Sequence, residues 1–424
     1  MPSAIQTATS IVNRCSSVDD YLRAIDRYSQ SMDWSEAEVA AALISVNGPH
    51  ADLPFLHLEN YGSRTHRTFI NDEVIDQIAC IHLHVLYHIN ISRNYADAYE
   101  LHTQIMTIFN REILQKRKEE NWFMPFFYKF CTDVRGIARL ADEMEEDEDD
   151  VEENPNEMKT FYEKCANPIM ESYRSCVTDT RPDFSVTKKI ALLNMTNQLF
   201  RIYFKINKLN LLKPLIRTID NAGPLFDYFS MADKVTYNYF LGRKAMFDSD
   251  LPLAEKSLSY AFRNCPKDAE RNKRLVLIYL IPVKMFLGHM PNKQLLHKYQ
   301  LDEFQEVVEA VREGNLAQLD RSLARNEDFF IQCGIFLMLE KLRGITYRTL
   351  FKKVSLMMGS NMVPLQAFMD CLKFLNVHDV DDEELECIVA NLIAEKKIKG
   401  YLSHQHQKLV ISKKDPFPAL SAVL

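Results

Sequence analysis

Glycine is scarce and widely spaced in this chain. Average usage would place roughly thirty glycines in a chain of this size, but the 424 residues contain only 11. The two closest, Gly334 and Gly344, are ten residues apart. The phosphate loops GxGxxG and GxxxxGK[ST] and the GxSxG nucleophile elbow all need glycines at shorter spacing. The sequence therefore excludes these nucleotide-binding loops and the α/β-hydrolase fold, and its shortage of turn-forming glycine favours a mostly helical protein.

The remaining composition is typical of a globular protein. Hydrophobic residues make up 47% and charged residues 26% of the chain, and its length suits two or three packed units. Nine cysteines occur without any CxxC pair, which argues against a zinc site or a secreted disulfide framework. The amino terminus lacks the apolar core of a signal peptide, and the longest apolar run, Leu275 to Val283, is far shorter than the ~20 residues that span a bilayer. We expect a soluble intracellular protein with no membrane contact.

One short segment accounts for the net charge of −7. Ten of the twelve residues from Asp142 to Glu153 are acidic, which leaves 51 basic and 48 acidic residues in the rest of the chain. Such a run repels itself and stays solvated. We therefore predict a disordered acidic insert at residues 142–157. Its role stays open between a solubilising linker and a mimic of nucleic acid that covers a basic surface.

Amphipathic helical periodicity dominates the chain after residue 66. Apolar residues recur at i, i+3, i+4 and i+7, and short connections join the helices, which is typical of stacked helical hairpins. Residues 237–266 approach the tetratricopeptide (TPR) pattern, and the matching positions hold Leu241, Gly242, Ala254, Ala261 and Pro266. We predict an all-α fold with a TPR-like helical-repeat solenoid over residues 67–325. A weakly patterned amino-terminal extension precedes it at residues 1–66.

The pattern changes after Glu327. Helices are predicted at residues 345–357, 365–374 and 382–394, the last with an N-cap at Asp381 or Asp382. The segments IKGYLSH and KLVIS alternate and contain β-branched residues, which predicts a two-stranded β-hairpin. Three helices followed by a hairpin are the pattern of a winged-helix domain. We place this domain at residues 326–414, followed by a carboxy-terminal tail at residues 415–424.

No motif for catalysis or metal binding is recognisable. His82, His84 and His88 lie on one predicted helix, and the i, i+4 spacing of the last two can hold zinc. No HExxH motif surrounds them and no third ligand is evident, so helix packing is the better interpretation. No Ser/His/Asp or Cys/His arrangement has a recognisable local signature. We predict a protein that is not an enzyme and uses no metal or cofactor.

Basic side chains gather around the predicted winged helix and form the candidate nucleic-acid site. Lysine and arginine would contact phosphates there and give salt-sensitive binding with little sequence preference. The candidates are Arg343, Arg348, Lys352, Lys353, Lys396, Lys397, Lys399, His404, His406, Lys408, Lys413 and Lys414. The alternative is an ordinary solvated surface. The acidic stretch DVDDEELE at residues 379–386 argues against specific reading of base edges.

The sequence resembles the PCI domain family, whose members are scaffold subunits of the proteasome lid, the signalosome and a translation initiation factor. Within that family it is most similar to the Thp-type subunits of the nuclear transcription-and-export complex. The resemblance covers residues 67–424, and its longest segments are NQLFRIYFKINKLNLLKPLIRTID (197–220), YNYFLGRKAMFDSD (237–250), NKRLVLIYLIPVKMFLGHMP (272–291), CGIFLMLEKLRGITYRTLFKKV (333–354) and GYLSHQHQKLVISKKDPFP (400–418).

The resemblance implies partners and a location that composition does not reveal. A larger PCI scaffold protein of the Sac/GANP type is expected to pack against this chain, with the two winged helices side by side. A small acidic Sem-type subunit is expected to wrap around it, and for this contact we expect Lys273, Arg274 and Lys284. The paired winged helices would present a basic surface to RNA or DNA during messenger export. The expected location is the nucleus, at nuclear pores, with the cytoplasm as a second location.

Two functions are compatible with these features. The first is a scaffold subunit of the messenger-export complex that contacts nucleic acid through its winged helix. The second is a PCI subunit of a proteasome-lid or signalosome-like assembly, in which the winged helix only packs on another protein. The lysines of the predicted hairpin favour the first function, because a purely protein-packing surface has no need of them.

Overall fold

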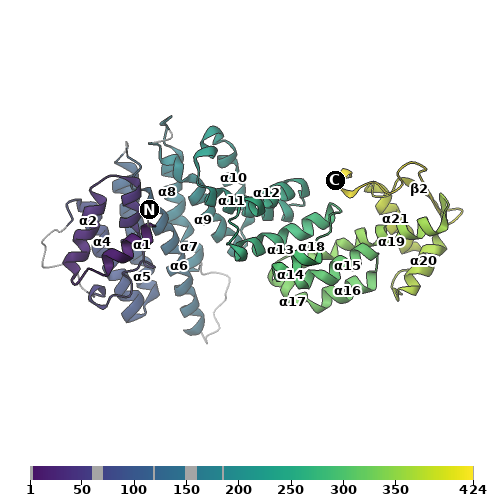
Figure 1. The fold of residues 1–424 in the computed structure, drawn as a ribbon, viewed down its shortest axis with the longest axis horizontal. Coiled ribbons are helices and arrows are strands. Elements are labelled where there is room, and N and C mark those ends of the chain that lie inside the picture. The colour runs from purple at the N-terminus through teal and green to yellow at the C-terminus, as the bar shows by residue number, and fades with distance from the viewer. Residues whose placement is uncertain (1–2, 60–69, 118–119, 149–159, 184–185, 424) are drawn as a thin grey trace. The chain divides into compact units, whose positions relative to one another are not determined.

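Helices follow one another along nearly the whole chain (Figure 1). A computed structural model describes residues 3–59, 70–117, 120–148, 160–183 and 186–423. Its contacts divide the chain into two units, Met1–Asp233 and Lys234–Leu424. The strands found in the described residues form one three-stranded sheet in the second unit. The predicted all-α class with a small β-hairpin is therefore confirmed. None of the helices in the described ranges has the length and apolarity to span a membrane.

The first unit consists of helices, and both sequential and non-sequential helices pack against each other in it. Their bounds are α1 (Ala4–Val12), α2 (Val18–Ser29), α3 (Trp34–Leu43), α4 (Glu73–Tyr87), α5 (Tyr95–Ile108), α6 (Met124–Glu148), α7 (Phe161–Lys164), α8 (Ala166–Val177), α9 (Leu192–Lys205) and α10 (Leu212–Asp220). Stretches of π-helix, His88–Ser92 and Phe109–Gln115, continue α4 and α5. Helix α11 (Met231–Phe247) starts at the end of this unit and continues into the second.

The amino-terminal residues are part of the fold and not an extension of it. Helices α1 and α2 both contact α3, and α3 contacts α6. The buried hydroxyl of Tyr21 donates a hydrogen bond to the carbonyl of Leu43. Small residues made this segment look weakly patterned, because α3 is an alanine-rich helix with buried residues around most of its circumference. The predicted boundary at residue 66 is therefore not a boundary of this unit.

The predicted acidic insert is helical where it begins. Helix α6 continues to Glu148, and the rest of the insert lies outside the described residues. Asp142 is not part of a solvated run, because its carboxylate accepts hydrogen bonds from the backbone N–H groups of Phe161 (2.7 Å) and Tyr162 (3.1 Å). The acidic side chain thus ties the end of α6 to the first turn of α7.

The second unit holds the carboxy-terminal part of the predicted helical repeat, from residue 234 on, and the winged helix. Its further elements are α12 (Leu251–Asn264), α13 (Glu270–Phe286), α14 (Lys293–Lys298), α15 (Gln305–Glu313), α16 (Leu316–Arg325), α17 (Glu327–Gln332), α18 (Phe336–Glu340), α19 (Leu342–Met358), β1 (Met362–Pro364), α20 (Leu365–Phe374), α21 (Asp382–Ala394), β2 (Gly400–Ser403) and β3 (Lys408–Ile411). Two adjacent cores fill it, one among the repeat helices and one in the winged helix.

The tetratricopeptide-like spacing reflects close helix packing in this unit. Gly242 of α11 lies against Leu258 of α12, and a Cβ atom at position 242 would lie only 2.5 Å from the Leu258 Cγ atom. Ala254 and Ala261 on α12 are fully buried. Small residues at these positions let neighbouring helices approach closely, as the sequence pattern predicted.

Candidate nucleic-acid interface

The carboxy-terminal part of the second unit is a winged helix. Helices α19, α20 and α21 pack with a sheet of order β1-β3-β2, and both strand pairs are antiparallel. Phe351, Phe368 and Leu409 are fully buried in the shared core. The predicted hairpin is present as β2 and β3, but the third strand, β1, was not predicted. Its three residues are too few to show an alternating pattern.

The wing, the turn 404–407 between β2 and β3, is held against helix α21. The Glu386 carboxylate contacts His404 Nδ1 at 2.7 Å and accepts a hydrogen bond from Gln407 Nε2 at 2.6 Å. Hydrogen bonds from Gln407 and His404 lower the pKa of Glu386 below its usual value. At the base of the hairpin only glycine fits, because a Cβ atom at Gly400 would lie 2.3 Å from the carbonyl oxygen of Val410. The wing therefore has a defined position relative to α21.

Arg348 is a structural residue and not a surface contact. Its side chain is buried on α19, and its guanidinium donates hydrogen bonds to the backbone carbonyls of Lys397 (3.2 Å) and Pro418 (2.6 Å). It also lies over the ring of Phe417. The prediction that Arg348 binds nucleic acid is wrong for this reason. The helical period gave a signal, since Arg348 is three residues from both Ile345 and Phe351 and shares their buried face.

Replacing Arg348 with methionine should destabilise the protein by about 2–3 kcal/mol, because one buried and one partly buried carbonyl group lose their charged donor. Lys352, exposed on the same helix, provides the matched control, and its replacement with methionine should change stability by less than about 0.5 kcal/mol. Urea unfolding of both variants measures the difference. If the Arg348→Met variant were stable but bound RNA more weakly, Arg348 would instead be a residue of the nucleic-acid interface.

Several other candidates already have partners within the second unit. Arg343 pairs with Asp320 (2.9 Å) and Asp379 (3.6 Å). The Lys353 ammonium donates a hydrogen bond to the Glu313 carbonyl at 2.8 Å. The remaining pairs are Lys397 with Glu395 (2.6 Å), Lys399 with Asp415 (2.9 Å) and His404 with Glu386. A phosphate would have to compete with these partners for the same cations.

Six candidates are exposed, and within the described ranges their side chains make no hydrogen bond or ion pair. They are Lys352, Lys396, His406, Lys408, Lys413 and Lys414. We call these six the free basic set. Five of them lie between the end of α21 and the segment after β3, so the structure concentrates free positive charge on and beside the wing. This half of the predicted site is available to an anionic ligand.

Helix α21, which corresponds in position to the groove-reading helix of DNA-binding winged helices, begins with acidic residues. Asp382, Glu383 and Glu384 are exposed in its first turn, where they stabilise the positive end of the helix dipole. The same carboxylates would repel phosphates on either side of a DNA groove. That the domain does not read base edges stays a prediction.

The three residues expected to contact an acidic subunit are engaged within the second unit. Lys273 is buried, with its ammonium 4.9 Å from the centre of the Phe262 ring. Arg274 donates two hydrogen bonds to the carbonyl of Gln300, at 3.1 and 3.2 Å. Lys284 forms an ion pair with Glu255. Lys273 is therefore too buried to act as a docking residue, whereas Arg274 and Lys284 keep part of their surface exposed.

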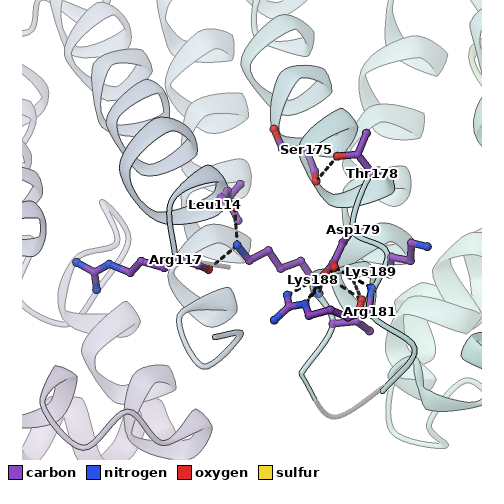
Figure 2. A network of polar contacts seen from close by, with 9 residues as sticks. Leu114, Arg117, Ser175, Thr178, Asp179, Arg181, Lys188 and Lys189 are labelled. Carbon is purple, nitrogen blue, oxygen red and sulfur yellow. Dashed lines mark hydrogen bonds and ion pairs between the residues drawn. The ribbon is translucent and has the colours of Figure 1, made fainter. Parts of the chain in front are cut away.

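Figure 2 shows a polar network in the first unit in which basic side chains stabilise the fold. The Asp179 carboxylate accepts hydrogen bonds from Arg181 Nη2 (2.7 Å) and from the Lys188 backbone (2.8 Å). The Lys188 ammonium is buried and donates to the carbonyls of Leu114 and Arg117. Burial lowers the pKa of Lys188 to about 8. A hollow of about 490 Å³ lies beside these residues, and Asp179 and Lys188 form hydrogen bonds that connect its walls.

Packing in the core explains His82, one of the three histidines that the sequence predicted on one helix. His82 is fully buried and its Nε2 lies 2.8 Å from His50 Nε2, whereas His88 contacts Ser92. Over the described ranges, no group of three or more His, Cys, Asp or Glu side chains could hold a metal ion. The packing interpretation of His82 is confirmed.

Comparison with known proteins supports the winged-helix assignment and identifies the family. Residues 323–413 match the model of the PCI domain. The chain is 60% identical over 408 residues to the PCI domain-containing protein 2 homolog of Caenorhabditis elegans, covering 96% of this chain and 98% of that protein. It is 44% identical over 408 residues to PCI domain-containing protein 2 of Xenopus laevis, with the same coverage. The homolog of Drosophila melanogaster is 40% identical over 406 residues, covering 95% of this chain and 99% of that protein. On this evidence the chain belongs to the PCI domain-containing protein 2 family.

Proposed function

We propose that this protein is a non-enzymatic PCI scaffold subunit of the nuclear-pore-associated complex that couples transcription to messenger export. In this role it binds a larger PCI scaffold of the Sac/GANP type and a small acidic Sem-type subunit. It contacts RNA or DNA through the wing of its winged helix, without sequence specificity. Its place of action is the nucleus, with the cytoplasm as a second location.

The free basic set is the observation that carries the nucleic-acid part of the proposal. Four of its lysines and its histidine are exposed on and beside the wing, and Lys352 is exposed on α19, although the chain as a whole has a net charge of −7. Lysines that contact phosphates as point charges supply affinity without reading sequence. The acidic start of α21 supports the same conclusion, because it disfavours insertion of that helix into a groove.

Exposed apolar residues on the winged helix support a protein partner. Leu356, Met357 and Met358 at the end of α19 are 70%, 82% and 47% exposed, and they are consecutive in the chain. Contiguous exposed apolar surface marks sites of protein interaction. This patch suits the expected PCI scaffold, and it is equally compatible with the second candidate function, a subunit of a proteasome-lid or signalosome-like assembly.

The salt dependence of RNA binding separates the two functions. We expect the full-length protein to bind fluorescein-labelled single-stranded RNA with an affinity that falls steeply with salt, with a slope of log K against log[salt] of about −3, because four to five lysines each release about 0.7 counterions. Fluorescence anisotropy measures this slope for the chain alone and for the assembly purified from cells.

A flat salt response, or no binding by either preparation, would contradict the messenger-export function and leave the protein-packing function. Identification of the larger PCI protein that copurifies with the chain provides the independent control. Copurification with proteasome or signalosome subunits in place of an export scaffold would support the second function.

A further inference from the structure

One face of the three-stranded sheet is exposed, and its strand register brings an aromatic, an aliphatic and a basic side chain together. Met362 of β1 and Tyr401 of β2 both pair with Val410 of β3, so these three residues form one row across the sheet. Pro364 and Ser403 both pair with Lys408 and form the next row. We call these six positions the outer sheet face. Residues paired in this way have Cβ atoms about 5 Å apart. The two rows lie next to each other on one face, because they are two residues apart along each strand.

The opposite face of the sheet is the one that belongs to the core. Val363 and Leu409 pair with each other and are fully buried. Because side chains alternate along a strand, burial of this row places Met362, Tyr401 and Lys408 on the solvent side. Tyr401 is 61% exposed and Met362 is 58% exposed. The described residues of the chain leave both side chains largely uncovered.

The chemistry of the outer sheet face combines a stacking surface with positive charge. A tyrosine ring beside Val410 and Met362 offers a flat apolar platform, and Lys408 of the free basic set stands in the adjoining row. Lys413 and Lys414 follow the end of β3 and are exposed as well. Single-stranded nucleic acids are bound where bases stack on aromatic side chains and a positively charged surface follows the backbone. Charge complementarity therefore favours a polyanion over an apolar protein surface at this face.

We propose that the outer sheet face binds single-stranded nucleic acid, with an unpaired base stacked on Tyr401 and the neighbouring phosphate held by Lys408. This inference rests on the proposed nucleic-acid contact of the wing and adds to it the strand state of the ligand. A duplex hides the faces of its bases in its own stack, so it can use the lysines but not Tyr401. Stacking accepts every base, and the site is therefore tolerant of sequence.

The test compares an intact single-stranded RNA with an abasic strand of the same length, each bound to the full-length protein and to the assembly purified from cells. Tyr401→Ala should weaken binding of the intact strand about 10-fold and leave binding of the abasic strand unchanged. Tyr401→Phe should retain the wild-type affinity. Phe374, 85% exposed at the end of α20, supplies the matched control, and Phe374→Ala should have no effect on either ligand.

Each result decides between the proposals. If the wild type binds RNA with the expected salt dependence but Tyr401→Ala behaves like Phe374→Ala, the stacking site is wrong and the proposed function stands. If neither the chain nor the assembly binds RNA, the proposed function fails, and the stacking site fails with it. If Tyr401→Ala releases a copurifying protein and RNA affinity is unchanged, the outer sheet face is a protein interface. Ultraviolet crosslinking of RNA to Tyr401, mapped by mass spectrometry, would support stacking directly.

Discussion

Lowering the pH from 7 to 5 should remove about 4 kcal/mol from the folding free energy of the first unit. Three buried histidines cause this loss. His50 and His82 contact each other, and His102 Nε2 lies 3.1 Å from the Phe130 carbonyl. Burial lowers the pKa of His50 to about 3 and that of His102 to about 4, and it lowers the pKa of His82 well below the usual value.

Stability decreases at lower pH because the unfolded state binds more protons than the folded state. Below about pH 6.5 the unfolded chain protonates its histidines, while the folded chain keeps these three neutral, so stability falls as the pH decreases toward 4. Each histidine contributes a slope of about 1.4 kcal/mol per pH unit in this window. Asp133 opposes the trend, because burial raises its pKa to about 6 in the fold and the folded state gains a proton first. The net loss is a large fraction of the 5–15 kcal/mol by which typical domains are stable.

Denaturant unfolding at pH 7, 6 and 5, followed by circular dichroism, measures the loss. His102→Gln keeps a donor for the Phe130 carbonyl and should reduce the slope by about 1.4 kcal/mol per pH unit. His297, which is 87% exposed in the second unit, is the control, and His297→Gln should leave the slope unchanged. Equal stability at pH 7 and pH 5 in the wild type would show that the histidines are protonated in the fold.

Reversing the charge of the free lysines should weaken single-stranded RNA binding by more than about 100-fold at physiological salt. The variant carries Lys396→Glu, Lys408→Glu, Lys413→Glu and Lys414→Glu. It loses four phosphate contacts and adds four repulsive charges, so the slope of log K against log[salt] should flatten by about 3. Anisotropy titrations across a salt series measure both effects. The four side chains make no intramolecular ion pair in the described part of the chain, so the fold should keep its stability.

A matched control separates local charge from net charge. Lys205, Lys256, Lys267 and Lys298 are exposed on the helices and loops outside the winged helix, and their reversal to glutamate changes the net charge by the same amount. We expect this control to bind RNA within about threefold of the wild type, because none of the four lysines belongs to the candidate nucleic-acid site. Equal losses in both variants would show that binding depends on overall charge and not on the wing.

Periodicity and capping residues predicted most of the secondary structure. The last helix begins after Asp381 as expected, since this side chain accepts a hydrogen bond from the Glu384 backbone. The hairpin of β2 and β3 also lies where alternation placed it. Local signals suffice here, because a helix or hairpin draws its caps, period and turn from residues close together in the chain. Strand β1 was not predicted, because its three residues are too few to show such a period.

The candidate site could be predicted only in part, because the sequence does not show which basic side chains are buried or already bonded to other residues. Arg348 bonds a carbonyl 70 residues away and Lys353 bonds one 40 residues away. Nothing in the sequence distinguishes Tyr401 from the many other aromatic residues of the chain. Its exposure depends on which face of the sheet meets the core.

The sequence by itself determined that the chain is helical, lacks glycine-rich phosphate loops and ends in a winged helix, because these properties follow from composition and short-range spacing. It also placed positive charge near the wing. Only the tertiary structure decided which of those charges remain free, since burial and ion pairing join residues distant in the chain. The same long-range packing turned one face of a small sheet toward the core and left Tyr401 and Lys408 together on the other.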